Sequence, residues 1–204
     1  MSELPKSKVN ASRPDSPFHC QGTDHVTVEG TNIEDTIEFY RDILGMSLVL
    51  KQPNLDRKEL THLFFDTGDG RLITFFVNEN RDSTEIQSPN PGQVHHLAFR
   101  IDGGQLNDII NALEDAGHPV SEFDRGAFHS LYTRDNNGLG IELVADKFAI
   151  PDERRGEVMA LAHQLRVESE DNFVKEEHMA EAMEQLGLDV QKTELKDAQS
   201  GQDF

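Results

Sequence analysis

The sequence predicts an α+β protein in which two tandem βαβββ modules form a curved mixed sheet, or cup, around a metal site, with helices added after the second module. The first supporting observation is an internal repeat. A short apolar strand that opens on a histidine occurs at residues 24–28 and again at 95–99. The second observation is that each strand is followed by an amphipathic helix that ends in a glycine, Gly45 or Gly117. A repeat of this size indicates two copies of one supersecondary unit.

The first module is predicted at residues 21–80, after a polar N-terminal arm at 1–20 that we expect to be flexible. Its helix is expected at 33–44, because apolar side chains recur there at helical spacing and Gly45 can end it. Short runs rich in β-forming residues and separated by turns then predict three strands, at 48–50, 62–65 and 72–77.

The second module is predicted at residues 94–147, after a polar linker at 81–93 that contains a strong turn signal. It repeats the order of the first module, with a helix at 104–116. The four strands of this module are expected at 94–101, 118–122, 128–134 and 139–145.

The pattern changes after the second module. A C-terminal extension at 148–188 contains two amphipathic helices, predicted at 152–166 and 174–186, and a polar tail at 189–204 is expected to be flexible. Because an apolar stripe on a helix usually packs against a core, we expect these helices to pack onto the sheet or onto a partner chain.

Charge and composition limit the classes of partner. The chain has 38 acidic and 19 basic residues and a net charge of −19, which repels nucleic-acid phosphates and anionic membranes. Such a surface is typical of adaptation to high salt, although an ordinary acidic protein can also carry it. There is no long apolar run, no secretory signal pattern and a single cysteine, Cys20. We therefore expect a cytoplasmic protein that binds neither nucleic acid nor membrane.

A metal site is predicted where the first and last strands of the modules meet. His25 and His96 open the first strands of the two modules. Glu142 lies in the last strand of the second module between apolar neighbours, a costly place for a carboxylate that is not paired, protonated or metal-bound. The equivalent residue of the first module is Thr74, a poor ligand. We therefore predict His25, His96 and Glu142 as the ligands.

Two imidazoles and one carboxylate with open positions suit a non-haem Fe(II) that binds a substrate and O₂ together, and Mn, Zn or Ni could use similar donors. Taken singly, each histidine could be a hydrogen-bonded core residue, and Glu142 could be an edge-strand acid. Their joint occurrence at positions related by the repeat favours the metal.

The segments that contain these residues resemble a known group of proteins, the vicinal oxygen chelate superfamily of glyoxalase, bleomycin-resistance and extradiol dioxygenase proteins. The resemblance spans about residues 22–147 and is carried by the segments 24–28, 37–46, 95–100 and 140–144. Within this group, segments 72–76 and 124–135 and the double histidine His95–His96 are similar to ring-cleaving extradiol dioxygenases of the hydroquinone type. Unlike those proteins, which usually have four modules per chain, this chain has two.

The resemblance implies roles for three further residues. His95, Tyr132 and Arg125 match residues that handle protons and substrate oxygens beside the metal. The side chains suit these roles, because His or Tyr can supply a proton and Arg can stabilise developing negative charge. On residue types alone, Tyr132 could equally be a core aromatic and Arg125 a solvated loop residue.

The function implied by the resemblance is that of an Fe(II)-dependent dioxygenase, an oxidoreductase that opens a dihydroxylated aromatic ring with O₂. Two alternatives use the same scaffold: a glyoxalase-type isomerase or lyase, and a small-molecule-binding resistance protein. A homodimer is expected, because exposed sheet edges and the additional helices offer pairing surfaces. The sequence leaves open whether the cup closes within one chain or between two chains.

Overall fold

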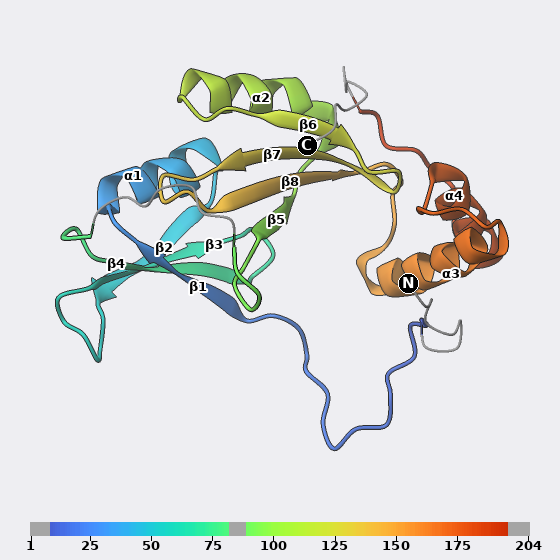
Figure 1. Ribbon diagram of the computed structural model, residues 1–204, viewed down its shortest axis with the longest axis horizontal. Helices are drawn as coiled ribbons and strands as arrows, with labels where there is room; N and C mark the ends of the chain where they lie inside the picture. Colours follow the sequence, from blue (N-terminus) through green and yellow to red (C-terminus); the bar gives the residue numbers. More distant parts are fainter. Residues whose placement is uncertain (1–8, 82–88, 196–204) are drawn as a thin grey trace.

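The computed structural model describes residues 9–81 and 89–195 and confirms the α+β fold with two βαβββ modules (Figure 1). The first module contains β1 (His25–Gly30), α1 (Ile33–Ile37), η2 (Glu38–Ile43), β2 (Ser47–Pro53), β3 (Thr61–Asp66) and β4 (Leu72–Val77). The second module contains β5 (His96–Arg100), η3 (Gly103–Gln105), α2 (Leu106–Asp115), β6 (Ser121–Asp124), β7 (Phe128–Arg134) and β8 (Gly140–Asp146).

Each module forms its own four-stranded mixed sheet, with strand orders β1-β4-β3-β2 and β5-β8-β7-β6. In each sheet one outer strand is parallel to its neighbour: β1 runs parallel to β4, and β5 runs parallel to β8. Within the described residues no ladder joins the two sheets, so β1 and β5 each keep one open edge. The cup expected from edge-to-edge joining of the modules is therefore not closed within one chain.

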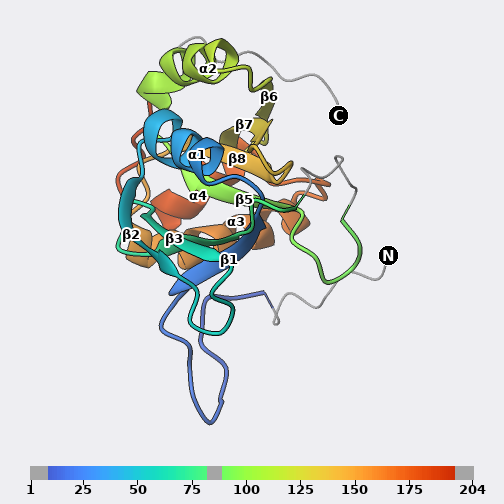
Figure 2. The same ribbon diagram turned by 90° about the vertical axis from the view of Figure 1, so that its left-hand side faces the viewer.

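The two modules share one apolar core, and α1 lies between the two sheets (Figures 1 and 2). Alternate side chains of β4, such as Ile73 and Phe75, point into this core, and Ile141 and Leu143 of β8 do the same. Period-2 alternation places His25 of β1 on the opposite face of the first sheet, together with Thr74 and Phe76 of β4.

The helix predicted at residues 33–44 is irregular. It is α-helical only over α1 and continues as a wider π-helical segment, η2, in which the Leu44 amide donates to the Phe39 carbonyl at 3.0 Å. The segment buries both Phe39 and Tyr40. The Tyr40 hydroxyl donates to Asp135 Oδ2 of the second module at 3.0 Å, so this helix also links the modules.

The C-terminal extension contains η4 (Asp152–Arg154), α3 (Arg155–Glu168) and α4 (Glu176–Gln185). Helices α3 and α4 form a hairpin with its own apolar core at one end of the second sheet (Figure 1). This cluster includes Phe148 and takes in Ala127 and Phe128 from the β6–β7 hairpin. The predicted helices therefore pack onto the end of the second sheet. Within the described part of the chain, no helix is both long and apolar enough to cross a membrane.

The structure also describes parts of the segments predicted to be flexible. Part of the tail is hydrogen-bonded to the segment that follows β8: the Thr193 amide donates to the Lys147 carbonyl at 2.9 Å, and an isolated β-bridge joins Phe148 and Lys192. Near the N-terminus, Gln164 Nε2 of α3 donates to the Val9 carbonyl at 3.2 Å. The rest of the predicted arm, linker and tail lies partly outside the described residues, at 1–8, 82–88 and 196–204.

Candidate metal centre

Two of the three predicted ligands meet on the second sheet. His96 opens β5, Glu142 lies on the adjacent strand β8, and His96 Nε2 is 2.8 Å from Glu142 Oε2. Two donors that each lie about 2.1 Å from one ion are themselves about 3 Å apart. The Glu142 carboxylate is buried, so it needs a compensating charge. The spacing and the chemistry of this pair therefore fit a divalent cation.

A glycine allows this close approach. Gly140 pairs with His96 in the ladder, and a Cβ atom at Gly140 would lie 3.0 Å from the His95 carbonyl oxygen and 3.2 Å from His96 Cβ. A side chain here would push β5 away from β8. Gly140 therefore helps to set the separation of the two candidate ligands.

The second oxygen of Glu142 is held by Tyr132. The Tyr132 hydroxyl donates to Glu142 Oε1 at 2.6 Å. Burial and then the neighbouring Glu142 carboxylate raise the pKa of the Tyr132 phenol, although Arg125 opposes this shift. Tyr132 is thus protonated at neutral pH, and its hydroxyl can both orient the carboxylate and donate a proton.

Arg125 completes this side of the site. It lies in the loop between β6 and β7, and its guanidinium carbon is 4.6 Å from the centre of the Phe123 ring and 5.2 Å from that of Tyr132. Stacking on two aromatic faces limits the motion of a side chain that is otherwise exposed. The positive charge of Arg125 therefore lies beside the Tyr132–Glu142 pair.

His95 contacts the other ring nitrogen of His96. The Nδ1 atoms of the two histidines are 2.8 Å apart, so one ring must donate and the other must accept. A His96 ring that binds an ion through Nε2 carries its proton on Nδ1 and donates to His95. His95 then carries its own proton on Nε2, which makes it an exposed proton donor beside the candidate site.

The third predicted ligand lies apart from this group. His25 opens β1 on the first sheet, where its Nδ1 is 2.6 Å from Asp24 Oδ1 and its side chain is 52% exposed. Among the residues that the structure describes, no group of three or more His, Cys, Asp and Glu side chains is spaced to hold a metal ion. Within one chain, His96 and Glu142 thus lie together with the predicted neighbours His95, Tyr132 and Arg125. His25 does not join this group.

The first sheet also contains a histidine to which the sequence assigns no role. His62 of β3 packs against the rings of Phe64 and Phe76, with ring centroids 3.9 and 4.6 Å away, and its buried Nε2 has no hydrogen-bond partner in the structure. Burial, and then the nearby His25, lower the pKa of His62. His62 therefore favours the neutral form.

Sequence reasoning also missed Lys147, whose side chain is only 7% exposed and lies between two carboxylates. A lysine that directly follows an apolar strand is a signal that could have identified it, because buried lysines are rare unless paired.

Comparisons with known proteins agree with this architecture. The sequence profile of the Glyoxalase/Bleomycin resistance protein/Dioxygenase superfamily matches residues 22–143. MhqE of Bacillus subtilis (strain 168), which has the name of a ring-cleaving dioxygenase, is 26% identical over 129 residues, or 62% of this chain and 42% of MhqE. Biphenyl-2,3-diol 1,2-dioxygenase 2 of Rhodococcus globerulus is 28% identical over 133 residues, 63% of this chain and 65% of that protein.

Two further relatives bear on fold and chemistry. The metallothiol transferase FosB of Staphylococcus haemolyticus is 29% identical over 126 residues, 60% of this chain and 82% of FosB. A crystal structure of a Bacillus subtilis protein described as a dioxygenase superposes with a TM-score of 0.54 at 25% identity, covering 63% of this chain and 41% of that one. The chain spans less than half the length of MhqE and of this structural relative.

Proposed function

Because the chain belongs to the glyoxalase, bleomycin resistance protein and dioxygenase superfamily, we propose that it is a metal-dependent ring-cleaving dioxygenase of the extradiol type. The observation that carries the proposal is the buried Glu142, which lies between His96 and Tyr132 with Arg125 alongside. The proposed substrates are a small dihydroxylated aromatic compound and O₂. Two relatives named as dioxygenases support this choice within the superfamily, and the name of one of them, MhqE, specifies ring cleavage.

His96 and Glu142 would hold the ion, Fe(II) in this proposal, which when bound would favour the ionised form of a diol oxygen and accept O₂ at an open position. Tyr132 would keep Glu142 oriented and protonate a reacting oxygen. His95 would exchange a proton through its exposed Nε2, in line with the usual use of imidazole as an acid or base. Arg125 would stabilise negative charge on the opening ring.

A second copy of the chain would complete the ligand set in this proposal. Among residues 9–81 and 89–195, β1 and β5 are unpaired on one edge each, and an open strand edge favours pairing with another chain. If β1 of one protomer lies beside β5 of its partner, the exposed His25 of one chain approaches the His96–Glu142 pair of the other. A two-fold dimer would contain two such sites.

The activity is tested by loading the purified protein with Fe(II) without oxygen, adding a panel of catechols and hydroquinones, and following O₂ uptake and ring opening by absorbance. We expect uptake with at least one diol and a loss of about 100-fold or more in the Glu142→Gln variant. Absence of uptake with every ring diol would reject the proposal.

The shared site is tested by mixing two inactive variants, His25→Ala and His96→Ala, under conditions that allow subunits to exchange. If the site lies between chains, each mixed dimer regains one intact site, and an equal mixture recovers about a quarter of the wild-type activity. A site closed within one chain would give no recovery. Each variant exchanged with itself is the control.

The similarity to FosB favours a second candidate, a metal-dependent transferase that acts on a small molecule. Glyoxalase-type relatives usually take a further ligand from the strand equivalent to β4, but Thr74 occupies that place. Thr74 is buried, and its hydroxyl donates to Thr27 Oγ1 at 2.9 Å. Iron found by elemental analysis of freshly purified protein would favour the dioxygenase, whereas zinc, nickel or manganese would favour this second candidate.

A further inference from the structure

We propose that the C-terminal helical hairpin positions Arg125 through the buried side chain of Lys147, which makes Lys147 a positioning residue of the candidate site. The profile match ends at residue 143, so Lys147 and the hairpin lie outside the region shared with the superfamily. The proposal rests on the proposed function only for the role of Arg125 toward the substrate, and its structural part can be tested without turnover.

Lys147 connects the hairpin to the loop that contains Arg125. Its Nζ is 2.6 Å from Asp124 Oδ1 and 2.9 Å from Glu176 Oε1 at the start of α4. The side chain of Lys147 is 7% exposed, and a buried ammonium group is costly unless carboxylates neutralise it. Asp124 and Glu176 are therefore both held to Lys147, and α4 is tied to the β6–β7 loop.

Asp124 precedes Arg125 in the chain, so the contact of Asp124 with Lys147 also restricts the loop around Arg125. The carboxylate oxygen that binds Lys147 also accepts a hydrogen bond from the Gly126 amide at 2.8 Å. Groups on both sides of Arg125 are thus fixed to one atom. The contact with Lys147 fixes the Asp124 oxygen that binds Gly126, and it therefore adds to the turn hydrogen bond from the Arg125 amide to the Phe128 carbonyl at 2.9 Å.

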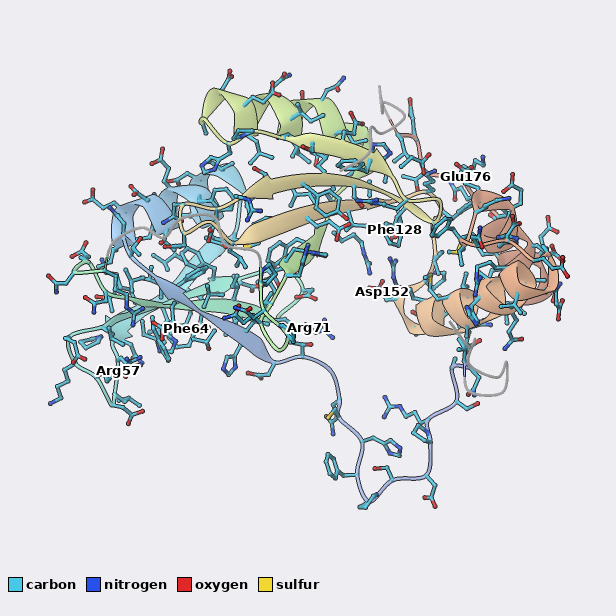
Figure 3. All side chains as sticks on the ribbon, in the orientation of Figure 1. Arg57, Phe64, Arg71, Phe128, Asp152 and Glu176 are labelled. Carbon is cyan, nitrogen blue, oxygen red and sulfur yellow. The ribbon has the colours of Figure 1, made fainter. Side chains whose placement is uncertain are left out.

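The hairpin also contacts the loop directly. Gly126 has a φ of +77°, and a Cβ atom there would lie 2.3 Å from the carbonyl oxygen of Val174, in the segment that leads into α4. Figure 3 labels Phe128 and Glu176, which mark this junction between the start of β7 and the start of α4. The loop is therefore held between the end of the sheet and the hairpin.

Arg125, which this loop holds, contacts residues of the candidate metal centre. Arg125 stacks on Phe123 and Tyr132, and Tyr132 donates to Glu142. A catalytic cation must lie within a fraction of an ångström of its working position to stabilise a transition state, and support from surrounding groups provides that precision. Lys147 thus connects the hairpin to Arg125 without itself touching the candidate ligands.

The first test needs no substrate. The full-length protein and its Lys147→Met variant are digested with trypsin under native conditions, and cleavage after Arg125 is followed by mass spectrometry. We expect the variant to be cut there about tenfold faster, because local opening of the loop limits cleavage. The matched control is Lys192→Met: Lys192 contacts the same Glu176 at 2.7 Å, but it is 68% exposed. Equal cleavage rates in wild type and Lys147→Met would overturn the proposal.

The second test is a double-mutant cycle on turnover. We expect Arg125→Met to lower kcat about 100-fold and Lys147→Met about tenfold, with the double variant no slower than Arg125→Met alone. Lys147→Arg, which keeps the charge, should recover most of the rate, and Lys192→Met should match wild type. Multiplicative losses in kcat would mean that Lys147 acts independently of Arg125 and would overturn the proposal. A wild-type protein without turnover would reject the proposed function instead, while the cleavage test would still decide whether the loop is held.

Discussion

At the scale of single residues, Glu142 shows how a costly placement becomes a functional signal. A carboxylate between apolar neighbours must find partners, and the structure supplies Tyr132 for one oxygen and His96 for the other. The sequence indicated the placement of Glu142 but not which partner each oxygen would take. That depended on the register of β7 against β8, in which Tyr132 lies opposite Glu142.

Replacing Tyr132 by Phe is expected to weaken metal binding about tenfold, because the hydroxyl orients a candidate ligand. Titration of the metal-free protein with Fe(II) or Co(II) measures this affinity. The matched control is Tyr40→Phe at the only other tyrosine, which should leave metal affinity unchanged because its partner is Asp135. Equal metal affinity in the wild type and the Tyr132→Phe variant would contradict the role assigned to Tyr132.

Buried hydroxyls offer a matched test of stability. The Oγ1 atom of Thr133 in β7 is buried without a hydrogen-bond partner, whereas Thr74 in β4 donates to Thr27. We expect Thr133→Val to leave the free energy of unfolding unchanged or to raise it by up to about 1 kcal/mol, and Thr74→Val to lower it by about 1 kcal/mol. Urea denaturation of both variants gives the two values. The reverse order would mean that Thr133 has a partner in solution.

At the scale of elements, the close approach of two strands can depend on a glycine. Gly140 allows β5 to lie against β8 beside His96. By contrast, the positions of most strands follow from short runs of β-forming residues separated by turns, which is why the predicted strands at 72–77 and 128–134 agree with β4 and β7. No local sequence pattern predicted the π-helical segment η2. Its wider hydrogen bonding accompanies the burial of both Phe39 and Tyr40, which depends on packing against the rest of the molecule.

The Gly140→Ala variant should lose about 1–3 kcal/mol of unfolding free energy, because the new methyl group forces β5 to shift, and it should also bind metal more weakly. Gly156 in α3 is the matched control, since a Cβ atom there meets nothing within 4 Å. Gly156→Ala should raise stability by up to about 1 kcal/mol, as expected for a helical position. Unchanged metal affinity in Gly140→Ala would show that the strand spacing is not needed for binding.

The contact between Lys147 and Asp124 predicts a dependence on pH. Burial alone would raise the pKa of Asp124, but its hydrogen bonds with Lys147 and Gly126 lower the pKa overall. A depressed pKa gives stability that is present above the unfolded value, about 3.9, and is lost as the pH falls through the folded value. The difference in urea midpoint between wild type and Lys147→Met should therefore be constant from about pH 5 to 8 and should narrow below about pH 4. A difference that widens in acid would contradict this contact.

At the scale of the whole molecule, the acidic surface and the arrangement of the two sheets decide how the chain behaves in solution. The net charge of −19 produces self-repulsion in the folded state, which salt screens. In the part of the chain that the structure describes, the open edges of β1 and β5 leave hydrogen-bonding groups available to a second chain. Both features therefore act on association between chains.

Salt is therefore expected to stabilise the protein. Raising NaCl from about 0.1 to 1 M shortens the Debye length from about 10 to 3 Å, and we expect the melting temperature to rise by a few degrees. Calorimetry at several salt concentrations measures the shift, and KCl at equal ionic strength should give the same result. A flat or falling melting temperature would show that repulsion between acidic side chains does not limit stability.

The sequence by itself determined the two modules and the order of their elements. It also placed His96 at the start of the first strand of the second module and Glu142 within the last strand. These follow from periodicity, turns and repeats, which are local properties of the chain. Only the tertiary structure decided that the two sheets do not join, that His25 lies apart from the other candidate ligands, and that Lys147 ties α4 to the loop of Arg125. The reason is physical: alternation specifies which face of a strand is buried, but the placement of one sheet against another depends on packing between segments far apart in the chain.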